Sequence, residues 1–246
     1  MTDIKHTREI YDKFSEHYHD YVTSKKNTHH RFIEKPAMLK LLKNEIKGKI
    51  VLDLGCGTGF FTKKIFSLGA KEIIGSDLSP NLIQIAKKEN PEINFYIGDS
   101  RKTSFKKSQF HVINSSLMVH YLQNLNSLFK EVSRILKKNG LFVFSMHHPV
   151  YDVVHRENIS GKKIRVFKNY FHNQKYYWDL GPKMKKMIAY HHTFEMIFDA
   201  LNKNGFIVEK LLEPTAPKKA EKFNKKLYSL SNQRPTFLLI KARKIK

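Results

Sequence analysis

The stretch VLDLGCGTGF, residues 51–60, places Gly55, Gly57 and Gly59 at every second position directly after an apolar run. Glycine has no side chain, so the main-chain amides of such a loop can approach a ligand closely. A dinucleotide, a nucleoside triphosphate and a sulfonium cofactor are the ligands to consider for it. The residues around the loop decide which of them fits.

Two phosphate-binding motifs fit this loop poorly. The dinucleotide fingerprint G-x-G-x-x-G needs a third glycine where Phe60 stands, and the P-loop needs a lysine that follows neither Gly57 nor Gly59. Asp53 adds a negative charge beside the loop, which repels a pyrophosphate and attracts an ammonium group. A triphosphate is therefore disfavoured, and a dinucleotide is weakened without being excluded.

Two later carboxylates could recognise an adenosyl group. Asp77 ends the apolar run EIIGSD, where a carboxylate can accept hydrogen bonds from both hydroxyls of a ribose. This feature is shared by NAD sites and adenosyl sites. Asp99 in the stretch GDS can accept from an exocyclic amine, and Ser100 offers a backbone N–H.

Histidines supply candidate general bases, because their ordinary pKa lies near 6.5. We predict His148 as the first candidate and His120 as the second, since both follow apolar runs. Side chains alternate along an extended segment, so one of His147 and His148 must face away from the site. The histidine pairs lack the i,i+4 spacing with an acidic partner that a metal site would use, so no metal is expected.

The elements that position these residues alternate regularly. Short apolar runs predict strands, and amphipathic patterns between them predict helices. The expected strands are 49–54, 72–78, 93–100, 110–116 and 141–150, and the expected helices are 59–70, 79–90 and 125–140. This alternation predicts an α/β fold: a Rossmann-like, seven-stranded, mostly parallel sheet with helices on both faces. Ligands of such sheets bind at the carboxyl ends of the strands.

The flanking segments extend this core into one domain over residues 1–246. Residues 1–46 carry two predicted N-terminal cap helices, at 9–22 and 30–46, and residues 47–150 form the cofactor-binding core. Residues 151–190 form an aromatic, β-rich insertion. Residues 191–246 supply a helix and two closing strands, with a polar segment at 216–233 that we expect to be mobile.

Composition narrows the class of protein further. Lys and Arg outnumber Asp and Glu by 45 to 22, which favours acidic partners, nucleic acid among them. The excess is mostly lysine spread along the chain, so a nucleic-acid partner is possible but not favoured. One cysteine, Cys56, gives no disulfide within the chain. The start of the sequence has no secretory pattern and no apolar run spans a bilayer, which predicts a cytoplasmic protein without a membrane partner.

Taken together, the motifs resemble those of class I S-adenosylmethionine-dependent methyltransferases, in the small-molecule (type 11/25-like) branch. The resemblance rests on VLDLGCGTGF, IIGSDLSPNLIQIAKK, INFYIGDS and FHVINSSLMVHYL, with cap-helix and C-terminal segments that are also similar. It covers nearly the whole chain and implies S-adenosyl-L-methionine as the cofactor.

The resemblance also implies a role for each site residue. Gly55, Gly57 and Gly59 would contact the methionyl part of the cofactor, and Asp53 would orient its amino group. Asp77 would hold the ribose, Leu78 would pack on the adenine, and Asp99 and Ser100 would form hydrogen bonds with the adenine edge. Ser115 would line the sulfonium end, and Tyr11, Tyr18 and Arg31 would close the pocket from the cap helices.

The methyl acceptor is predicted to be a small molecule attacked at O, N or C by in-line displacement. The sequence has no N-P-P-Y or D-P-P-Y stretch, which argues against methylation of a base amine, and Cys56 stands in the cofactor loop rather than at a nucleophile position. Rings of the insertion could roof the acceptor pocket: Phe167, Tyr170, Phe171, Tyr176, Tyr177 and Trp178. The alternatives are an RNA (tRNA or rRNA) methyltransferase, a non-catalytic S-adenosylmethionine-binding module and an NAD-dependent oxidoreductase.

Overall fold

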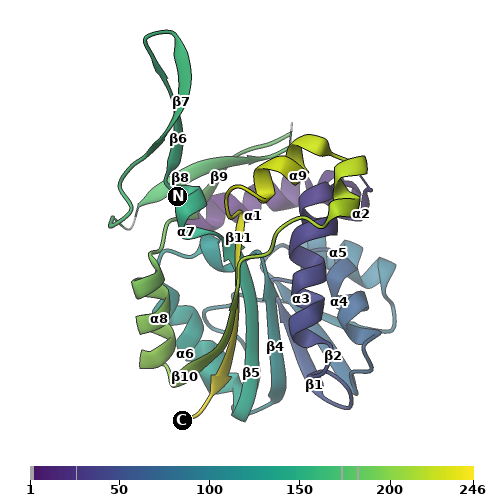
Figure 1. Cartoon of the computed structure of the whole chain (residues 1–246). Helices are drawn as coiled ribbons and strands as arrows, with labels where there is room; N and C mark the ends of the chain where they lie inside the picture. Colours follow the sequence, from purple (N-terminus) through teal and green to yellow (C-terminus); the bar gives the residue numbers. More distant parts are fainter. Residues whose placement is uncertain (1–2, 26, 173, 182) are drawn as a thin grey trace.

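The predicted apolar runs form the strands of one seven-stranded sheet. The computed structural model describes residues 3–25, 27–172, 174–181 and 183–246. The strands are β1 (Ile50–Leu54), β2 (Glu72–Asp77), β3 (Asn94–Ile97), β4 (Phe110–Ser116), β5 (Leu136–His147), β10 (Phe206–Leu212) and β11 (Phe237–Lys244). Their order is β10-β11-β5-β4-β1-β2-β3, and only β11 runs antiparallel to its neighbours (Figure 1). The predicted fold class is confirmed.

Apolar side chains on both faces of the sheet explain why helices cover it twice. Neighbouring residues of a strand point to opposite faces, so Val51 packs into one core and Leu52 into the other. The first core receives α3 (Lys35–Leu42), α4 (Phe60–Phe66) and α5 (Pro80–Glu89), and the second receives α6 (Leu125–Ile135) and α8 (Phe194–Lys203). The chain reverses its direction of travel across the sheet between β1 and β4, where ligands of such folds bind.

The helix predicted at 125–140 is too long. α6 ends at Ile135, and Leu136 already begins β5 by pairing with Phe110. The ammonium group of Lys244 donates to the carbonyls of Ser133 and Leu136, which satisfies acceptors that a continuing helix would have used. A contact from the far end of the sequence thus sets this boundary.

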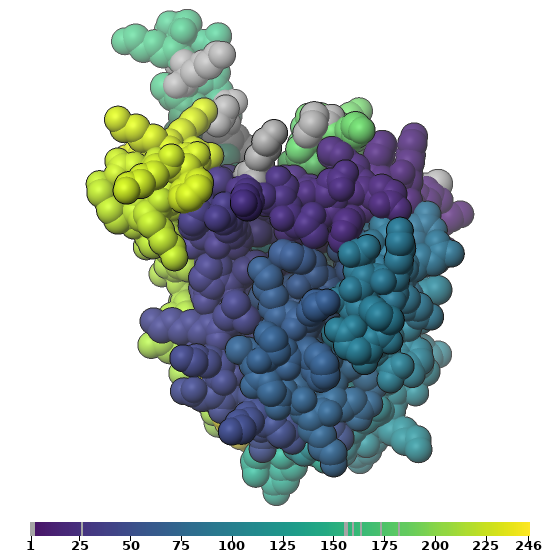
Figure 2. Space-filling view, turned by 90° about the vertical axis from the view of Figure 1, so that its right-hand side faces the viewer, coloured from purple at the N-terminus to yellow at the C-terminus, as the bar shows by residue number. Residues whose placement is uncertain are grey.

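The single helix predicted at 9–22 is two helices, α1 (Asp3–Lys13) and α2 (Ser15–Thr23), with a break at Phe14. A π-helical turn, η1 (His30–Glu34), then leads into α3. α1 is fixed to the start of α5, because the carboxylate of Asp12 accepts from Ser79 and its carbonyl accepts from Asn81. Figure 2 shows this N-terminal layer lying across one end of the core.

The insertion consists of a short helix, α7 (Pro149–Asp152), and two hairpins. β6 (Val154–Ile159) pairs with β7 (Lys162–Phe167), and β8 (Lys175–Leu180) pairs with β9 (Met184–Tyr190). The β6–β7 hairpin stands away from the body, whereas β8–β9 lies across the carboxyl end of the sheet (Figure 1). Some residues of these predicted segments lie outside the described residues. They are residues 1, 2 and 26 of the predicted cap segment 1–46 and residues 173 and 182 of the predicted insertion.

The segment 216–233, expected to be mobile, is instead helical. It forms the 3-10 turn η3 (Lys218–Lys222) and α9 (Lys225–Ser231), and the Asn224 side chain caps α9 by accepting from the Leu227 amide at 2.9 Å. Ala220 and Leu227 are buried in the first core, which the lysine-rich composition concealed. In the part of the chain that the structure describes, no helix has the length and apolarity needed to traverse a bilayer.

Candidate active site

A first cavity opens at the carboxyl edge of the sheet, beyond the ends of β1, β2 and β4. The loops after four strands line it together with α1 and α2. The ends of these strands and the segments that follow them contribute Leu54, Gly55, Gly57, Ser76, Asp77, Leu78, Ser79, Leu82, Gly98, Asp99, Ser100, Ser116, Leu117, Met118, Tyr121 and Leu122, and α1 and α2 contribute Ile4, Thr7, Arg8, Tyr11 and Tyr18. Eight predicted cofactor residues are among them: Tyr11, Tyr18, Gly55, Gly57, Asp77, Leu78, Asp99 and Ser100.

The glycine loop brings bare backbone to this cavity. Gly55 and Gly57 have φ angles of +79° and +57°, which residues with side chains rarely adopt. A Cβ atom on Gly55 would lie 2.7 Å from Cγ of Met118, and one on Gly57 would lie 3.1 Å from the Tyr18 ring. The loop therefore needs glycine both for its conformation and for its close approach to the opposite wall.

Asp77 joins the glycine loop to β2. Its carboxylate accepts hydrogen bonds from the Gly57 amide at 2.9 Å and from the Ser79 amide at 3.0 Å. Burial raises the pKa of Asp77, while these backbone donors act to lower it. Each carboxylate oxygen keeps a further lone pair for a ligand donor.

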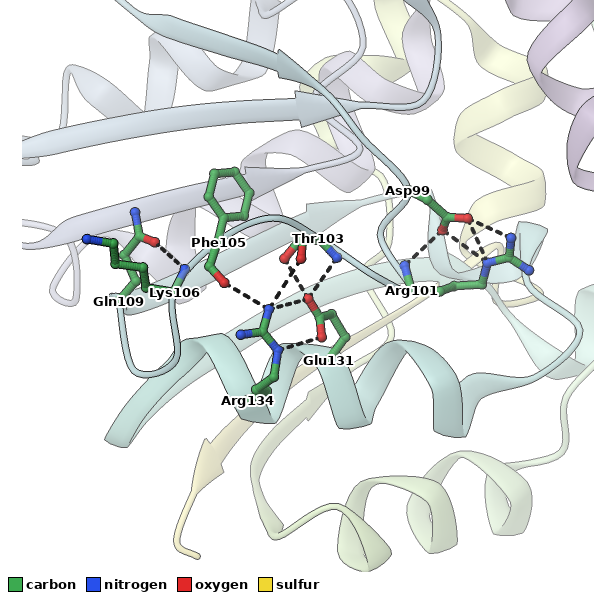
Figure 3. Close-up of polar contacts among 8 residues, drawn as sticks. All are labelled: Asp99, Arg101, Thr103, Phe105, Lys106, Gln109, Glu131 and Arg134. Atoms are coloured by element: carbon green, nitrogen blue, oxygen red, sulfur yellow. Dashed lines mark hydrogen bonds and ion pairs between the residues drawn. The ribbon is translucent and has the colours of Figure 1, made fainter.

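Asp99 also lines the cavity, from the loop that follows β3, and Figure 3 shows it beside Arg101. Its carboxylate forms a two-pronged ion pair with the Arg101 guanidinium, the shortest N···O distance being 2.6 Å. Burial raises the pKa of Asp99, but Arg101 outweighs it and leaves the pKa below its ordinary value. The carboxylate is therefore ionised and held in place.

Two predicted cofactor residues hold the framework together instead of lining the cavity. Asp53 is 1% exposed, and its oxygens accept from Thr62 Oγ1 and Asn114 Nδ2, each at 2.6 Å, so it links β1 to α4 and β4. Gly59 begins α4, and a Cβ atom there would lie 2.8 Å from Asn90 and from Phe95.

Ser115 and Arg31 also lie away from the cavity lining. Side chains alternate along β4, so Ser116 faces the cavity and Ser115 is buried on the other side of the strand. The Arg31 guanidinium lies 5.0 Å from the ring centres of both Phe32 and Phe223, at the surface. The sequence placed these residues near the right elements, but it did not fix which way each side chain points.

Sequence reasoning missed the residues that α1 and the turn after β4 contribute. Thr7 and Arg8 come from a part of α1 that precedes the predicted helix start. Met118, Tyr121 and Leu122 stand in LMVHYL, directly after β4. Their place after a parallel strand was the signal that could have identified them.

A second cavity, of about 280 Å³, adjoins the first. Tyr11, Tyr18, Leu117 and Tyr121 line both, so the two share a wall. The remaining lining residues are Tyr21, His29, His30, His120, His147, Tyr151, Tyr176, Trp178, Asp179, Leu180, Thr236 and Phe237. From the predicted aromatic roof, Tyr176 and Trp178 are in this lining, whereas Phe167, Tyr170, Phe171 and Tyr177 are not.

Two stacked imidazoles stand in the wall of the second cavity. His120, from the 3-10 turn η2 (Val119–Tyr121), lies parallel to His147 with ring centres 3.9 Å apart. His147 Nδ1 is 2.9 Å from the Tyr176 hydroxyl. Burial lowers the pKa of His120 well below its ordinary value and that of His147 to about 3, so both rings are neutral at pH 7.

His148, the first candidate for a general base, lies outside the lining of both cavities. Its Nδ1 accepts from the Val150 amide at 3.1 Å, which caps α7, and its Nε2 lies 2.7 Å from the Glu213 carboxylate. The alternation at the end of β5 thus turns His147 toward the cavity and His148 away from it. Among the described residues, no group of three or more His, Cys, Asp or Glu is arranged to hold a metal ion.

Comparisons with known proteins show which family the chain is similar to. A family model described as "Methyltransferase domain" matches residues 52–144. An uncharacterized protein of Haemophilus influenzae is 31% identical over 226 residues, 87% of each chain. The malonyl-[acyl-carrier protein] O-methyltransferase of Legionella pneumophila is 30% identical over 151 residues, 57% of this chain and 50% of that protein. A crystal structure of an S-adenosylmethionine-dependent methyltransferase from Mesorhizobium loti superimposes with a TM-score of 0.73 at 27% identity, covering 85% of this chain and 96% of that one.

Proposed function

The chain belongs to the class I S-adenosylmethionine-dependent methyltransferases, and we propose that its first cavity holds the cofactor and its second a small-molecule methyl acceptor. The observation that carries this proposal is the shared wall of the two cavities. A methyl group moves by in-line displacement only when nucleophile, carbon and sulfur are aligned at close range. Tyr11, Tyr18, Leu117 and Tyr121 stand where the two ligands would meet.

The residues of the first cavity fit an adenosyl cofactor. The glycine cradle at Gly55 and Gly57 leaves room that a Cβ atom would remove. The carboxylates of Asp77 and Asp99 come from two different strand ends of this cavity, and we assign the first to the ribose and the second to the adenine amine. We assign contacts with the cofactor to Tyr11, Tyr18, Gly55, Gly57, Asp77, Leu78, Asp99 and Ser100.

The remaining predicted cofactor residues support the cavity indirectly in this proposal. Asp53 fixes α4 and β4 relative to β1, and Gly59 lets α4 begin close to Asn90 and Phe95. Ser116 takes the place proposed for Ser115, because it lines the cavity at the end of β4. Arg31 packs at the surface against Phe223.

The size and cover of the second cavity favour a small molecule. Its volume of about 280 Å³ is near the lower end of ordinary ligand pockets. Trp178 and Leu180 of β8 form part of its wall, so the insertion shapes the acceptor site.

Isothermal titration calorimetry tests the assignment of the first cavity. We expect S-adenosylmethionine and its demethylated product, S-adenosylhomocysteine, to bind once per chain. Asp77→Asn should weaken both about tenfold or more, because one charge-assisted hydrogen bond to the ribose is lost. Asp20→Asn changes an exposed carboxylate of α2 and should leave the affinity unchanged. Tight binding of NAD without binding of S-adenosylmethionine would contradict the proposal.

A further inference from the structure

The walls of the second cavity define the chemical class of the molecule that it holds. Half of its sixteen described lining residues are Tyr, Trp or Phe, and four more are histidines. Aromatic walls favour flat molecules, because ring faces stack or meet edge to face. The acceptor is therefore expected to present a ring or another conjugated plane.

The cavity has little charge to offer an ion. No lysine or arginine is among its described lining residues, although the chain contains 45 of them. The one lining carboxylate, Asp179, is exposed and pairs with Lys185 at 3.0 Å. Arg234 lies 5.2 Å from the Tyr151 ring centre without lining the cavity. A phosphate or carboxylate would lose water here without gaining a lining cation, so an uncharged acceptor fits best.

Buried polar atoms show where the acceptor must form hydrogen bonds. Both ring nitrogens of His120 are buried and have no hydrogen-bond partner, and the side chain is 1% exposed. Trp178 Nε1 is buried and unpaired in the same wall. A buried polar group without a partner destabilises the folded protein. A neutral imidazole presents one acceptor and one donor nitrogen, so the bound molecule has to supply the partner of the acceptor.

We propose that the methyl acceptor is an uncharged, flat molecule with a ring hydroxyl group, and that His120 accepts the hydroxyl proton as the methyl group is transferred. This inference rests on the proposed function. The bound cofactor supplies an activated sulfonium methyl group. The hydroxyl oxygen forms a bond to the methyl carbon, the carbon–sulfur bond breaks with its electron pair on sulfur, and the proton passes to a His120 nitrogen.

The charge balance of this step suits a cavity without lining cations. One positive charge is present before the reaction, on sulfur, and one is present afterwards, on the imidazole of His120. His147 stacks against that imidazole, and the Asp152 carboxylate lies 3.9 Å from His147 Nδ1. His147 is thus a positioning residue, held in turn by Tyr176.

Three naphthalene probes test the recognition part of the proposal. Calorimetry on protein saturated with S-adenosylhomocysteine compares 2-naphthol with its methyl ether, 2-methoxynaphthalene, and with 2-naphthyl phosphate. We expect 2-naphthol to bind about tenfold more tightly than either, because it alone donates a hydrogen bond without carrying a charge. Trp178 is the only tryptophan of the chain, so quenching of its fluorescence reports whether the probe enters this cavity.

Two matched variants identify the recognising group. His120→Phe keeps a ring stacked on His147 but removes both nitrogens, so the preference for 2-naphthol over its ether should fall to about twofold or less. With S-adenosylmethionine as cofactor, this variant should form 2-methoxynaphthalene at least about a hundredfold more slowly than the wild type. His172→Phe alters an exposed histidine that lines neither cavity and should keep both the preference and the rate.

The outcomes separate this inference from the proposed function. Binding of 2-naphthyl phosphate as tight as that of 2-naphthol would overturn the inference. An unchanged preference for 2-naphthol over its ether in His120→Phe, or an unchanged rate in that variant, would also overturn the inference. The absence of 2-naphthol binding to protein that binds S-adenosylhomocysteine would overturn it as well. Failure of S-adenosylhomocysteine itself to bind would overturn the proposed function.

Discussion

At the residue scale, a buried carboxylate lies behind the histidine pair of the second cavity. Asp152 is 7% exposed, and its two oxygens lie 3.9 Å from His147 Nδ1 and 3.7 Å from His191 Nδ1. Burial raises its pKa from 3.8 to about 6, although the nearby His191 and Tyr176 act in the opposite direction. A negative charge at this buried position therefore weakens the fold.

The raised pKa of Asp152 predicts a pH-dependent difference in stability. The folded state binds the proton more tightly than the unfolded chain does. The stabilisation from this group is therefore complete below pH 3.8 and is lost as the pH rises through about 6. The loss amounts to about 3 kcal/mol. Asp152→Asn, which cannot ionise, should exceed the wild type in free energy of unfolding by up to that amount at pH 7.5, and by little at pH 4.

Urea denaturation of both proteins between pH 4 and pH 7.5 measures this difference. Comparing the two proteins cancels the contribution of the buried histidines, which they share. Asp179→Asn is the control, because Asp179 is exposed and its pKa is lowered by a hydrogen bond from the Lys186 amide. A difference between Asp152→Asn and wild type that stays constant with pH would show that Asp152 titrates normally.

At the element scale, the loop between β3 and β4 carries Asp99 and is held by α6. The Glu131 carboxylate accepts from the Thr103 amide at 2.8 Å and from its hydroxyl at 2.6 Å (Figure 3). Arg134 donates to the Phe105 carbonyl at 2.9 Å and also pairs with Glu131. The polar side chains of the helix thus fix this loop in place.

We expect Glu131→Ala to loosen this loop without unfolding the sheet. The variant loses both Thr103 contacts and the partner of Arg134, so hydrogen exchange should speed up in residues 98–109. Affinity for S-adenosylhomocysteine should fall about three- to tenfold, because ordering the loop then opposes binding. Glu89→Ala, at an exposed position of α5, should change neither quantity. Weaker binding with unaltered exchange in the loop would mean that Glu131 acts by another route.

The sequence predicted elements better than side-chain directions. Periodicity and glycine spacing predicted the strands and helices of the sheet, and the family resemblance supplied the eight predicted residues that line the first cavity. The end of α6 depended on Lys244, more than a hundred residues away, and local patterns do not contain that contact. Ser115 and His148 were each displaced by one position, because a strand's register decides which of two neighbours faces a cavity. α9 was missed because its buried face is small and its surface is rich in lysine.

At the scale of the whole molecule, the β6–β7 hairpin and the rest of the protein, which we call the body, form separate sets of contacts. The hairpin stands away from the sheet (Figure 1), and none of its described residues lines either cavity. Its base is tied to the body at Tyr170, whose carbonyl lies 2.8 Å from His191 Nε2. The chemistry proposed for the body therefore does not need the hairpin.

Shortening this hairpin tests that separation. Replacing residues 157–164 by two glycines removes its outer part and keeps the segment that leads to Tyr170. Affinity for S-adenosylhomocysteine should stay within about twofold, and the thermal midpoint should shift by less than about 3 °C, because few apolar contacts are lost. Replacement of the β8–β9 turn is the contrasting change and should weaken 2-naphthol binding. Loss of cofactor binding on shortening β6–β7 would show that the hairpin reaches the first cavity.

The position of β11 constrains how the protein folds during its synthesis. β11 follows every other strand along the chain, yet it lies between β5 and β10 and contributes Leu238, Ile240 and Ala242 to the second core. Until β11 has left the ribosome, β5 keeps one open edge and β10 has no neighbour in the sheet. Strands with open edges are prone to pairing with other chains. Translation that pauses before Phe237 would therefore leave the nascent protein dependent on chaperones, even though every named lining residue of the first cavity has already been synthesised.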